Sequence, residues 1–376
     1  MADRRSEPAG RLRVTGEADT LSGAAEASGD RGRRRPTMTD VARAAGVSAM
    51  TVSYVYSRPG RVSEATAAKV RRAARRLGYP GPHPGARALR RGRAGSLGVV
   101  LGEPLTYAFD DPQAARFLAG MAGVCATERV GLTLVPITGA ADDVERVAEA
   151  AVDGFVVWTT ADDDPVLDAV AATDLPAVIH GGPGRRGLAV VAIDDRASAR
   201  AIGAEAFAGA RRPAVLSFPL DRARRGATIH GPDPAAATFP VTRRRLQGLR
   251  DACVATGGAW ARVPVLVCSR NSAAEGEAAA AELLRRPDAP DAIAAMSDEL
   301  ALGALRAAAR ARVPVPDGLA VTGWDDTEAA TPAGLTTVAQ SLHDQGAHCA
   351  QLALGGAATG IHEASWRIVR RASTRG

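Results

Sequence analysis

The chain has 376 residues, of which 46% are hydrophobic, and a net charge of +6 at pH 7. This length predicts two or three folded domains, and the hydrophobic content suits a folded core. No apolar run reaches the roughly 18 residues that a membrane-spanning helix needs. The N-terminus lacks the apolar core of a secretory signal, so we expect a cytoplasmic protein with no membrane partner.

Positive charge is concentrated in one segment. Residues 31–93 hold 16 Arg and Lys against two acidic residues, whereas residues 1–30 hold four basic and six acidic residues. A basic segment attached to a mildly acidic body indicates a polyanionic partner for that segment; a solvated arginine-rich surface is the alternative. Residues 1–35 combine Gly, Ala, Ser and charges without periodicity, so we interpret them as a disordered tail.

The cysteines are isolated from one another in the sequence. They are Cys125, Cys253, Cys268 and Cys349. None forms a C-x-x-C pair, and none lies near histidines with metal-ligand spacing. We therefore expect free thiols in a reducing compartment, no metal site and no cofactor.

Residues 36–80 predict three short helices in the arrangement of a helix-turn-helix head. Thr39 is suited to cap the first helix, and Gly46 to end it in the left-handed conformation. Ser48 and Ser63 are suited to cap the second and third helices. Helical spacing predicts the buried side chains Val41, Ala42, Ala45, Val52, Val55, Val70, Ala74 and Leu77. It turns partly or wholly outward the side chains of Ala49, Met50, Thr51, Ser53 and Tyr54.

The run DVARAAGVSAMTVSYVY resembles the DNA-binding head of the lactose-repressor (LacI/GalR) family. Every fixed position of the family pattern D-V-A-x-x-A-G-V-S-x-x-T-V-S-x-V is matched. Residues 79–89 resemble the family's hinge, with one extra residue after Tyr79 and His83 where Asn is usual. Tyr54 occupies a position that is commonly Arg. The resemblance implies a homodimer that binds a pseudo-palindromic operator in double-stranded DNA.

The second helix would then lie in the major groove. Ala49, Met50 and Tyr54 are the expected base-reading residues, and the polar and basic residues around them are the expected phosphate contacts. Met50 as a core residue is the alternative. The predicted DNA contacts are Thr39, Ser48, Ala49, Met50, Thr51, Ser53, Tyr54, Ser57, Arg58, Arg61, Arg87 and Leu89.

Residues 81–95 are the expected hinge. Gly85 and the prolines around it argue against a stable helix in the free protein. Leu89 stands where the family inserts a leucine wedge into the minor groove, which kinks the DNA. A flexible arginine-rich linker with an exposed Leu89 is the alternative interpretation.

Residues 96–374 alternate short apolar strands with helices, which predicts parallel sheets in an α/β fold. The predicted strands are 96–101, 133–137, 154–158, 177–179, 190–193, 214–217, 263–268, 292–296 and 319–323. The predicted helices are 112–130, 142–151, 241–256, 273–286 and 298–310. The series resembles the two-lobed type I periplasmic-binding-protein core of LacI/GalR regulators. Residues 220–240 are predicted to form a long loop, either a lid over the cleft or a segment without a role.

Ligands of open parallel sheets bind outside the carboxyl ends of the strands. Residues that end or follow predicted strands are therefore candidates for binding a small-molecule effector: Tyr107, Phe109, Asp110, Trp158, Asp195, Ser297, Trp324 and Asp325. Arg245, in the predicted helix 241–256, joins them because its surroundings resemble the family's R-x-x-G helix start. The resemblance supports Arg245, Ser297 and Asp325, whose surroundings match family motifs. For Arg245 and Asp325 the alternative is a structural ion pair between the lobes. For the tryptophans it is the core, and for the other aspartates a helix cap.

These features together indicate a transcriptional repressor controlled by an effector between the lobes. A sugar fits best, because a carboxylate accepts from two hydroxyls while arginine donates in a rigid fork. A purine effector and an activator or dual regulator on the same scaffold are the alternatives. An enzyme is not expected, because the sequence contains no nucleophile elbow, phosphate loop or metal-ligand cluster.

Overall fold

The computed structural model describes residues 36–81, 92–102, 107–356 and 359–375, without the side chains of Pro59, Tyr107 and Ala108. The chain divides into two compact units, Met1–Pro84 and Gly85–Gly376. The predictions for the tail and for the hinge residues Arg87 and Leu89 lie outside the described residues. None of the helices in the described ranges has the length and apolar character needed to cross a bilayer.

The first unit contains the three predicted helices, α1 (Met38–Ala45), α2 (Ala49–Ser57) and α3 (Glu64–Leu77). A short 3-10 turn, Pro59–Arg61, precedes α3. Their small core consists of the predicted valines and alanines together with Ala67 and Ala73. Two predictions about burial were wrong. Leu77 at the end of α3 is exposed, whereas Ser53 in α2 is buried.

The caps of these helices follow the sequence with one correction. Thr37, not Thr39, caps α1, and it forms a reciprocal capping box with Asp40. Met38 is thus already helical, and the exposed Thr39 lies in the first turn. Ser48 caps α2 and Ser63 caps α3, as predicted. Gly46 ends α1 with a φ of 61°, a conformation that glycine enters without steric cost.

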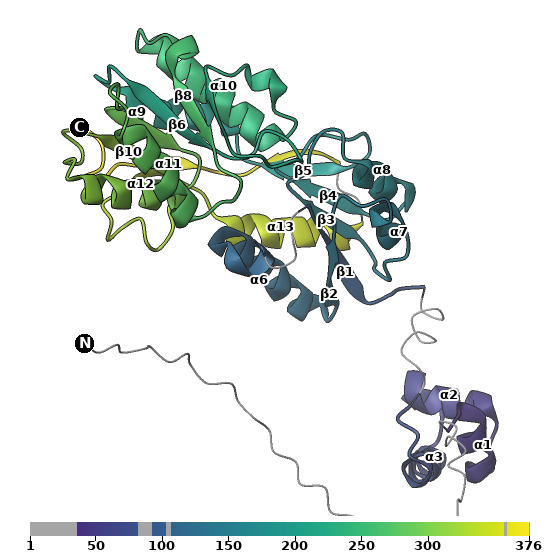
Figure 1. Cartoon of the computed structure of the whole chain (residues 1–376). Helices are drawn as coiled ribbons and strands as arrows, with labels where there is room; N and C mark the ends of the chain where they lie inside the picture. Colours follow the sequence, from purple (N-terminus) through teal and green to yellow (C-terminus); the bar gives the residue numbers. More distant parts are fainter. Residues whose placement is uncertain (1–35, 82–91, 103–106, 357–358, 376) are drawn as a thin grey trace, which may run out of the picture. The chain divides into compact units, whose positions relative to one another are not determined.

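The second unit begins with a six-stranded parallel sheet, which we call lobe 1 together with its helices. In spatial order its strands are β12 (Gly360–Glu363), β5 (Ala189–Ala192), β4 (Ala177–His180), β3 (Phe155–Trp158), β1 (Ser96–Leu101) and β2 (Gly131–Pro136). One layer of helices is α6 (Pro112–Glu128) with α13 (Leu342–Gly355), which lie side by side (Figure 1). The other is α7 (Asp143–Ala148) with α8 (Pro165–Ala172).

Lobe 2 is a seven-stranded sheet with two helix pairs. Its spatial order is β13 (Arg367–Val369), β11 (Thr336–Ala339), β10 (Ala320–Asp325), β9 (Ala292–Ala295), β6 (Pro213–Ser217), β8 (Pro264–Val267) and β7 (Ala227–His230). The two edge strands are antiparallel to their neighbours, and the inner strands are parallel. The helix pairs are α9 (Asp195–Phe207) with α10 (Pro240–Ala255), and α11 (Ala273–Leu284) with α12 (Asp298–Ala311). The predicted two-lobed fold with parallel sheets is confirmed.

Three connections join the lobes: β5 to α9, β11 to α13, and β12 to β13. The chain therefore returns to lobe 1 after lobe 2 is almost complete, so α13 belongs to the lobe that the N-terminal strands began. The prediction of a long loop at 220–240 was wrong in part. That segment contains the edge strand β7 and the 3-10 turn Pro234–Ala236.

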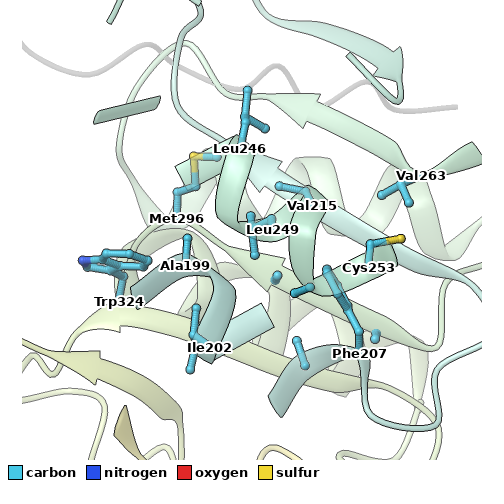
Figure 2. Close-up of a cluster of buried hydrophobic side chains, with 14 of the residues drawn as sticks. Ala199, Ile202, Phe207, Val215, Leu246, Leu249, Cys253, Val263, Met296 and Trp324 are labelled. Atoms are coloured by element: carbon cyan, nitrogen blue, oxygen red, sulfur yellow. The ribbon is translucent and has the colours of Figure 1, made fainter. Parts of the chain in front are cut away.

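The helix pairs pack closely on their sheets. Figure 2 shows the core under α9 and α10, where Ile202, Leu246 and Leu249 meet Val215 of β6. The pairs α6/α13, α9/α10 and α11/α12 cross at glycines: a Cβ on Gly248 of α10 would lie 2.3 Å from the carbonyl oxygen of Arg196. Glycine at these crossings permits backbone contact that a side chain would prevent.

Candidate functional site

A cavity of about 720 Å³ lies between the two lobes. Lobe 1 and the connections contribute Asp110, Asp111, Gln113, Trp158, Thr159, His180, Gly181, Ala192, Ile193, Gln340, Leu342 and Gln345. Lobe 2 contributes Asp195, Phe218, Pro219, Arg224, Phe239, Val241, Thr242, Arg245, Ser269, Arg270, Asn271, Ser272 and Asp325. Many of these residues end or follow strands, because parallel strands present their carboxyl ends at one edge of each sheet.

Arg245 in the first half of α10 is held in a buried ion pair. Its Nε donates to Asp195 Oδ1 at 2.9 Å, and its Nη1 donates to the carbonyl oxygen of Met296 at 2.7 Å. Burial raises the pKa of Asp195, and the Arg245 guanidinium opposes that rise. Both partners belong to lobe 2, so the pair does not join the lobes. Nη2 of Arg245 has no hydrogen-bond partner among the described residues.

The ring of Trp324 packs against the guanidinium of Arg245. The guanidinium carbon lies 3.8 Å from the Trp324 ring centroid, a cation–π geometry. Trp324 is only 1% exposed, belongs to the core under α9 and α10, and does not line the cavity. The structure thus gives Trp324 the core position that was its alternative, with a contact to the residue that does reach the cavity.

Asp325, the last residue of β10, lines the cavity beside Arg245. Its Oδ1 accepts a hydrogen bond from Gln340 Nε2 at 2.7 Å, and its Oδ2 has no hydrogen-bond partner within the described part of the chain. Burial raises the pKa of Asp325 well above its usual value; Arg245 opposes the rise and Asp298 adds to it. Its φ of 109° is rare for a residue with a side chain, so the surrounding structure must hold it.

Asp298 holds the turn that carries Asp325. This completely buried residue at the start of α12 accepts from the Thr327 amide and from Thr337 Oγ1, each at 2.7 Å. The two bonds tie the residues after β10 to β11. Burial raises the pKa of Asp298 to about 6, and hydrogen bonds from Thr337 and Thr327 oppose the rise.

On the lobe 1 side, Trp158 and His180 stack on each other, with ring centroids 4.9 Å apart and an interplanar angle of 14°. Phe117 of α6 packs against both rings. The His180 ring therefore covers one face of Trp158. Burial lowers the pKa of His180 to about 4, a hydrogen bond to Gln345 opposes the shift and Arg245 adds to it, so the ring is neutral at pH 7.

Hydrogen bonds across the cleft close part of its rim. Asn271 follows β8, and its Nδ2 donates to Asp111 Oδ2 of lobe 1 at 2.6 Å. Ser297 Oγ donates to Asn271 Oδ1 at 2.5 Å, and Ser297 itself does not line the cavity. Elsewhere Arg243 of α10 forms an ion pair with Asp162 of lobe 1.

The segment 220–240 contributes a wall. Arg224 and Phe239 line the cavity, with the Arg224 guanidinium 5.2 Å from the Phe239 ring centroid. Arg224 Nη2 also donates to the carbonyl oxygen of Gly102 in lobe 1 at 3.3 Å. Of the two roles left open for this segment, its position favours a part in covering the cavity.

The predicted effector residues fall into two groups. Asp110, Trp158, Asp195, Arg245 and Asp325 line one cavity, whereas Ser297, Trp324 and the 69%-exposed Phe109 do not. The Tyr107 side chain lies outside the described residues. Among the cavity residues that were not predicted from the sequence are His180, Asn271, Gln340 and Gln345. Asn271 and His180 end or follow strands that were predicted, so the strand-end rule applied to every strand would have found both.

The isolated cysteines are all free and buried. Burial raises the pKa of the Cys268 thiol to about 12, so it is not a thiolate at neutral pH. Within the described ranges, no cluster of three His, Cys, Asp or Glu residues has the arrangement of a metal site.

The first unit presents α2 as its candidate DNA-reading surface. Met50 is 60% exposed, which favours the predicted contact role over a core role. Ala49 is exposed, and Thr51 and Tyr54 are half-buried. The side chain of Ser57 donates to the Ser53 carbonyl oxygen at 2.8 Å. Ser53 is buried, so it contacts DNA only if the head rearranges. The remaining predicted residues Ser48, Arg58 and Arg61 are exposed.

Comparison with known proteins agrees with both units. Residues 37–81 match the model of bacterial regulatory proteins of the lacI family, and residues 208–374 match a periplasmic binding protein-like domain. The HTH-type transcriptional regulator Rv3575c of Mycobacterium tuberculosis is 38% identical over 317 residues, which cover 83% of this chain and 88% of the relative.

Two solved structures are similar over most of the chain. A LacI-family regulator from Corynebacterium glutamicum superimposes with a TM-score of 0.69 at 29% identity, covering 91% of this chain and all of that one. The complex of the transcriptional regulator CelR with cellobiose superimposes with a TM-score of 0.62 at 26% identity, covering 90% of this chain and all of that one.

A helix-turn-helix head and a two-lobed, periplasmic-binding-protein-like core define a DNA-binding transcriptional regulator rather than an enzyme. The chain belongs to the lacI family of bacterial regulatory proteins.

Proposed function

We propose that this regulator is a repressor whose affinity for a pseudo-palindromic operator is controlled by a sugar bound between the lobes. The observation that carries the proposal is the pairing of Arg245 and Asp325 on one cavity wall. Arg245 Nη2 is a donor and Asp325 Oδ2 an acceptor, and neither is used by another described residue. Adjacent hydroxyls of a sugar both donate and accept, so they satisfy the two groups together.

The charge of the cavity favours an uncharged ligand. Asp195 neutralises Arg245 within a buried ion pair, and the other charged side chains of the lining nearly balance, with Asp110, Asp111 and Asp325 against Arg224 and Arg270. A sugar phosphate would add negative charge to a lining that already holds four aspartates against three arginines. The similarity to the CelR–cellobiose complex supports the same ligand class.

DNA recognition is assigned to α2 of a homodimer, in which two heads read two half-sites. Effector binding changes the arrangement of the lobes and so the separation of the two heads. Linkage requires that operator binding and effector binding change each other's affinity by the same factor. Repression rather than activation rests on the family resemblance, and the operator's position relative to the promoter distinguishes the two.

A thermal-shift screen tests the effector assignment. Neutral mono- and disaccharides, polyols, sugar phosphates and purines are compared on the full-length protein. A neutral sugar or polyol is expected to raise the melting temperature by on the order of 5 °C at about 100 times its Kd. Asp325→Asn should abolish the shift, since it replaces a carboxyl oxygen by an amide nitrogen that cannot accept, while Asn tolerates a positive φ. Asp288→Ala, at an exposed position outside the cavity, should keep it.

A response to purines or sugar phosphates alone would contradict the neutral-sugar proposal. A shift that survives Asp325→Asn at full size would place the ligand elsewhere. No response to any compound would leave the family assignment intact but remove the support for control by these ligands.

Two head variants separate base reading from phosphate contact. Tyr54→Phe removes one hydroxyl and should weaken binding to the preferred operator by about 1 kcal/mol, or roughly fivefold, with relaxed selectivity at one base pair per half-site. Arg61→Gln should weaken all sequences alike and reduce the salt dependence of log K by about 1 for each head. Fluorescence anisotropy at several salt concentrations measures both. If Tyr54→Phe weakened binding to preferred and random DNA equally, as Arg61→Gln is expected to do, the assignment of Tyr54 to base reading would be contradicted.

A further inference from the structure

A chain of three side-chain hydrogen bonds joins Asp325 of lobe 2 to His180 of lobe 1. Gln340 Nε2 donates to Asp325 Oδ1 at 2.7 Å, and Gln345 Nε2 donates to Gln340 Oε1 at 3.0 Å. Gln345 Oε1 lies 2.8 Å from His180 Nε2. All four side chains line the cavity between the lobes.

The two glutamines lie on one of the connections between the lobes. Gln340 follows β11 of lobe 2, and Gln345 lies in the first turn of α13, which packs in lobe 1. His180 ends β4 and Asp325 ends β10. The chain of bonds therefore runs from one sheet to the other along a crossover rather than across the open cavity.

When Asp325 is ionised, it sets the direction of the chain. An ionised carboxylate only accepts hydrogen bonds, whereas an amide has one accepting oxygen and one donating nitrogen. Gln340 must turn its nitrogen to Asp325, so its oxygen faces Gln345. Gln345 then turns its oxygen to His180. The neutral ring must carry its hydrogen on Nε2, which leaves Nδ1 as a bare acceptor, and Nδ1 is buried without a hydrogen-bond partner in the described structure.

We propose that Gln340 and Gln345 are positioning residues that transmit the hydrogen-bonding state of Asp325 to His180, so that both walls of the cavity respond to one event. The inference rests on the proposed effector role of the cavity. When Asp325 takes a proton from solvent, or a ligand donor occupies it, the acceptor that orders the chain is weakened. The amides are then free to reverse, and His180 gains access to its second tautomer, with its single hydrogen on Nδ1.

Other charged groups face the ends of the chain. Arg245 of α10, Asp298 of α12 and Asp111 before α6 act on Asp325, and Arg245 also acts on His180. Titration of these groups would reach His180 through space, without the glutamines. A test of the proposal must therefore separate transmission through Gln340 from direct electrostatic effects.

Nitrogen-15 spectra of the histidine rings provide that test on the full-length protein without any ligand. The chain has six histidines, so the His180 resonances are assigned as those missing from His180→Asn. The pH is raised from roughly 5 to 9, a range that brackets strongly raised carboxyl pKa values. We expect the Nε2–H tautomer of His180 at high pH. The chemical shifts of both ring nitrogens should show an inflection at the pH where Asp325 titrates.

The inflection should disappear in Asp325→Asn and in Gln340→Met, which keeps side-chain length and leaves His180 and Gln345 unchanged. It should persist in Gln351→Leu, an exposed glutamine on α13, the helix that carries Gln345. Unchanged resonances of the other histidines show that a variant has folded. Should Gln340→Met not fold, Gln340→Leu replaces it, and the wild-type tautomer remains decisive.

An Nδ1–H tautomer at high pH overturns the proposal, as does a wild-type protein without the inflection. So does an inflection that survives Gln340→Met. An inflection that survives Asp325→Asn comes from the titration of another group, and it also overturns the proposal. Because no effector is used, failure of the sugar screen leaves this result standing, and failure here leaves the sugar assignment untouched.

Discussion

Arg245→Met is expected to lower the free energy of unfolding by about 3–5 kcal/mol and to abolish effector binding. The loss follows from Asp195, which is only 2% exposed and would keep a buried charge without its partner. Methionine fills a similar volume, so a cavity contributes little. Urea denaturation followed by tryptophan fluorescence measures the free energy of unfolding. The thermal shift with the identified effector measures binding.

Two further variants decide between the ligand and structural roles of Arg245. Arg244→Met, at the preceding position of α10, should change stability by less than about 0.5 kcal/mol. The double variant Arg245→Met/Asp195→Leu should recover much of the stability, since it removes both charges, but not effector binding. If Arg245→Met were as stable as the wild type, the buried Asp195 carboxyl would not be ionised in the variant. Recovery of binding in the double variant would show that Arg245 has only a structural role.

Gly120→Ala and Gly123→Ala should change stability in opposite directions, although both lie in α6. A Cβ on Gly120 would lie 1.9 Å from the carbonyl oxygen of His343, so α6 and α13 must move apart. We expect a loss of about 1–3 kcal/mol. Gly123 faces open space, and alanine there should raise the free energy of unfolding by up to about 1 kcal/mol through helix propensity.

The same urea experiment measures both variants. A loss in Gly123→Ala, or a gain in Gly120→Ala, would contradict the close approach of the helices. The two helix pairs of lobe 2 repeat this feature. Gly203 and Gly248 lie where α9 meets α10, and Gly276 and Gly303 lie where α11 meets α12.

The sequence predicted the architecture because its signals are local. Strands such as 96–101 are short apolar runs, and the head has a dense pattern of caps and turns. Several elements were not predicted, among them the helices α8, α9 and α13 and the strands β7, β11 and β12. Two of them show why. Helix α9 begins directly after the connection from β5 and alternates Ala with charged residues. The edge strand β7 has exposed side chains and no apolar run, which made its segment look like a loop.

The site was predicted only in part, because its contacts join distant residues. Asp325 and Arg245 were found through strand ends and family motifs. Trp324 was assigned to the cavity, yet neighbouring residues of a strand point to opposite sides, and the sequence did not say which side faces the core. His180 and Gln345 are separated by 165 positions and form one hydrogen bond. Nothing in either local sequence indicates that partner.

The central claim is that a ligand between the lobes controls operator binding. Its most direct test is fluorescence anisotropy of a selected operator duplex with the full-length protein, with and without the compound found in the thermal-shift screen. We predict that a saturating effector changes the operator Kd by roughly 5- to 150-fold. Asp325→Asn should bind the operator as the wild type does and show no response. An operator Kd that stays the same, although the compound binds the wild type, would contradict the account.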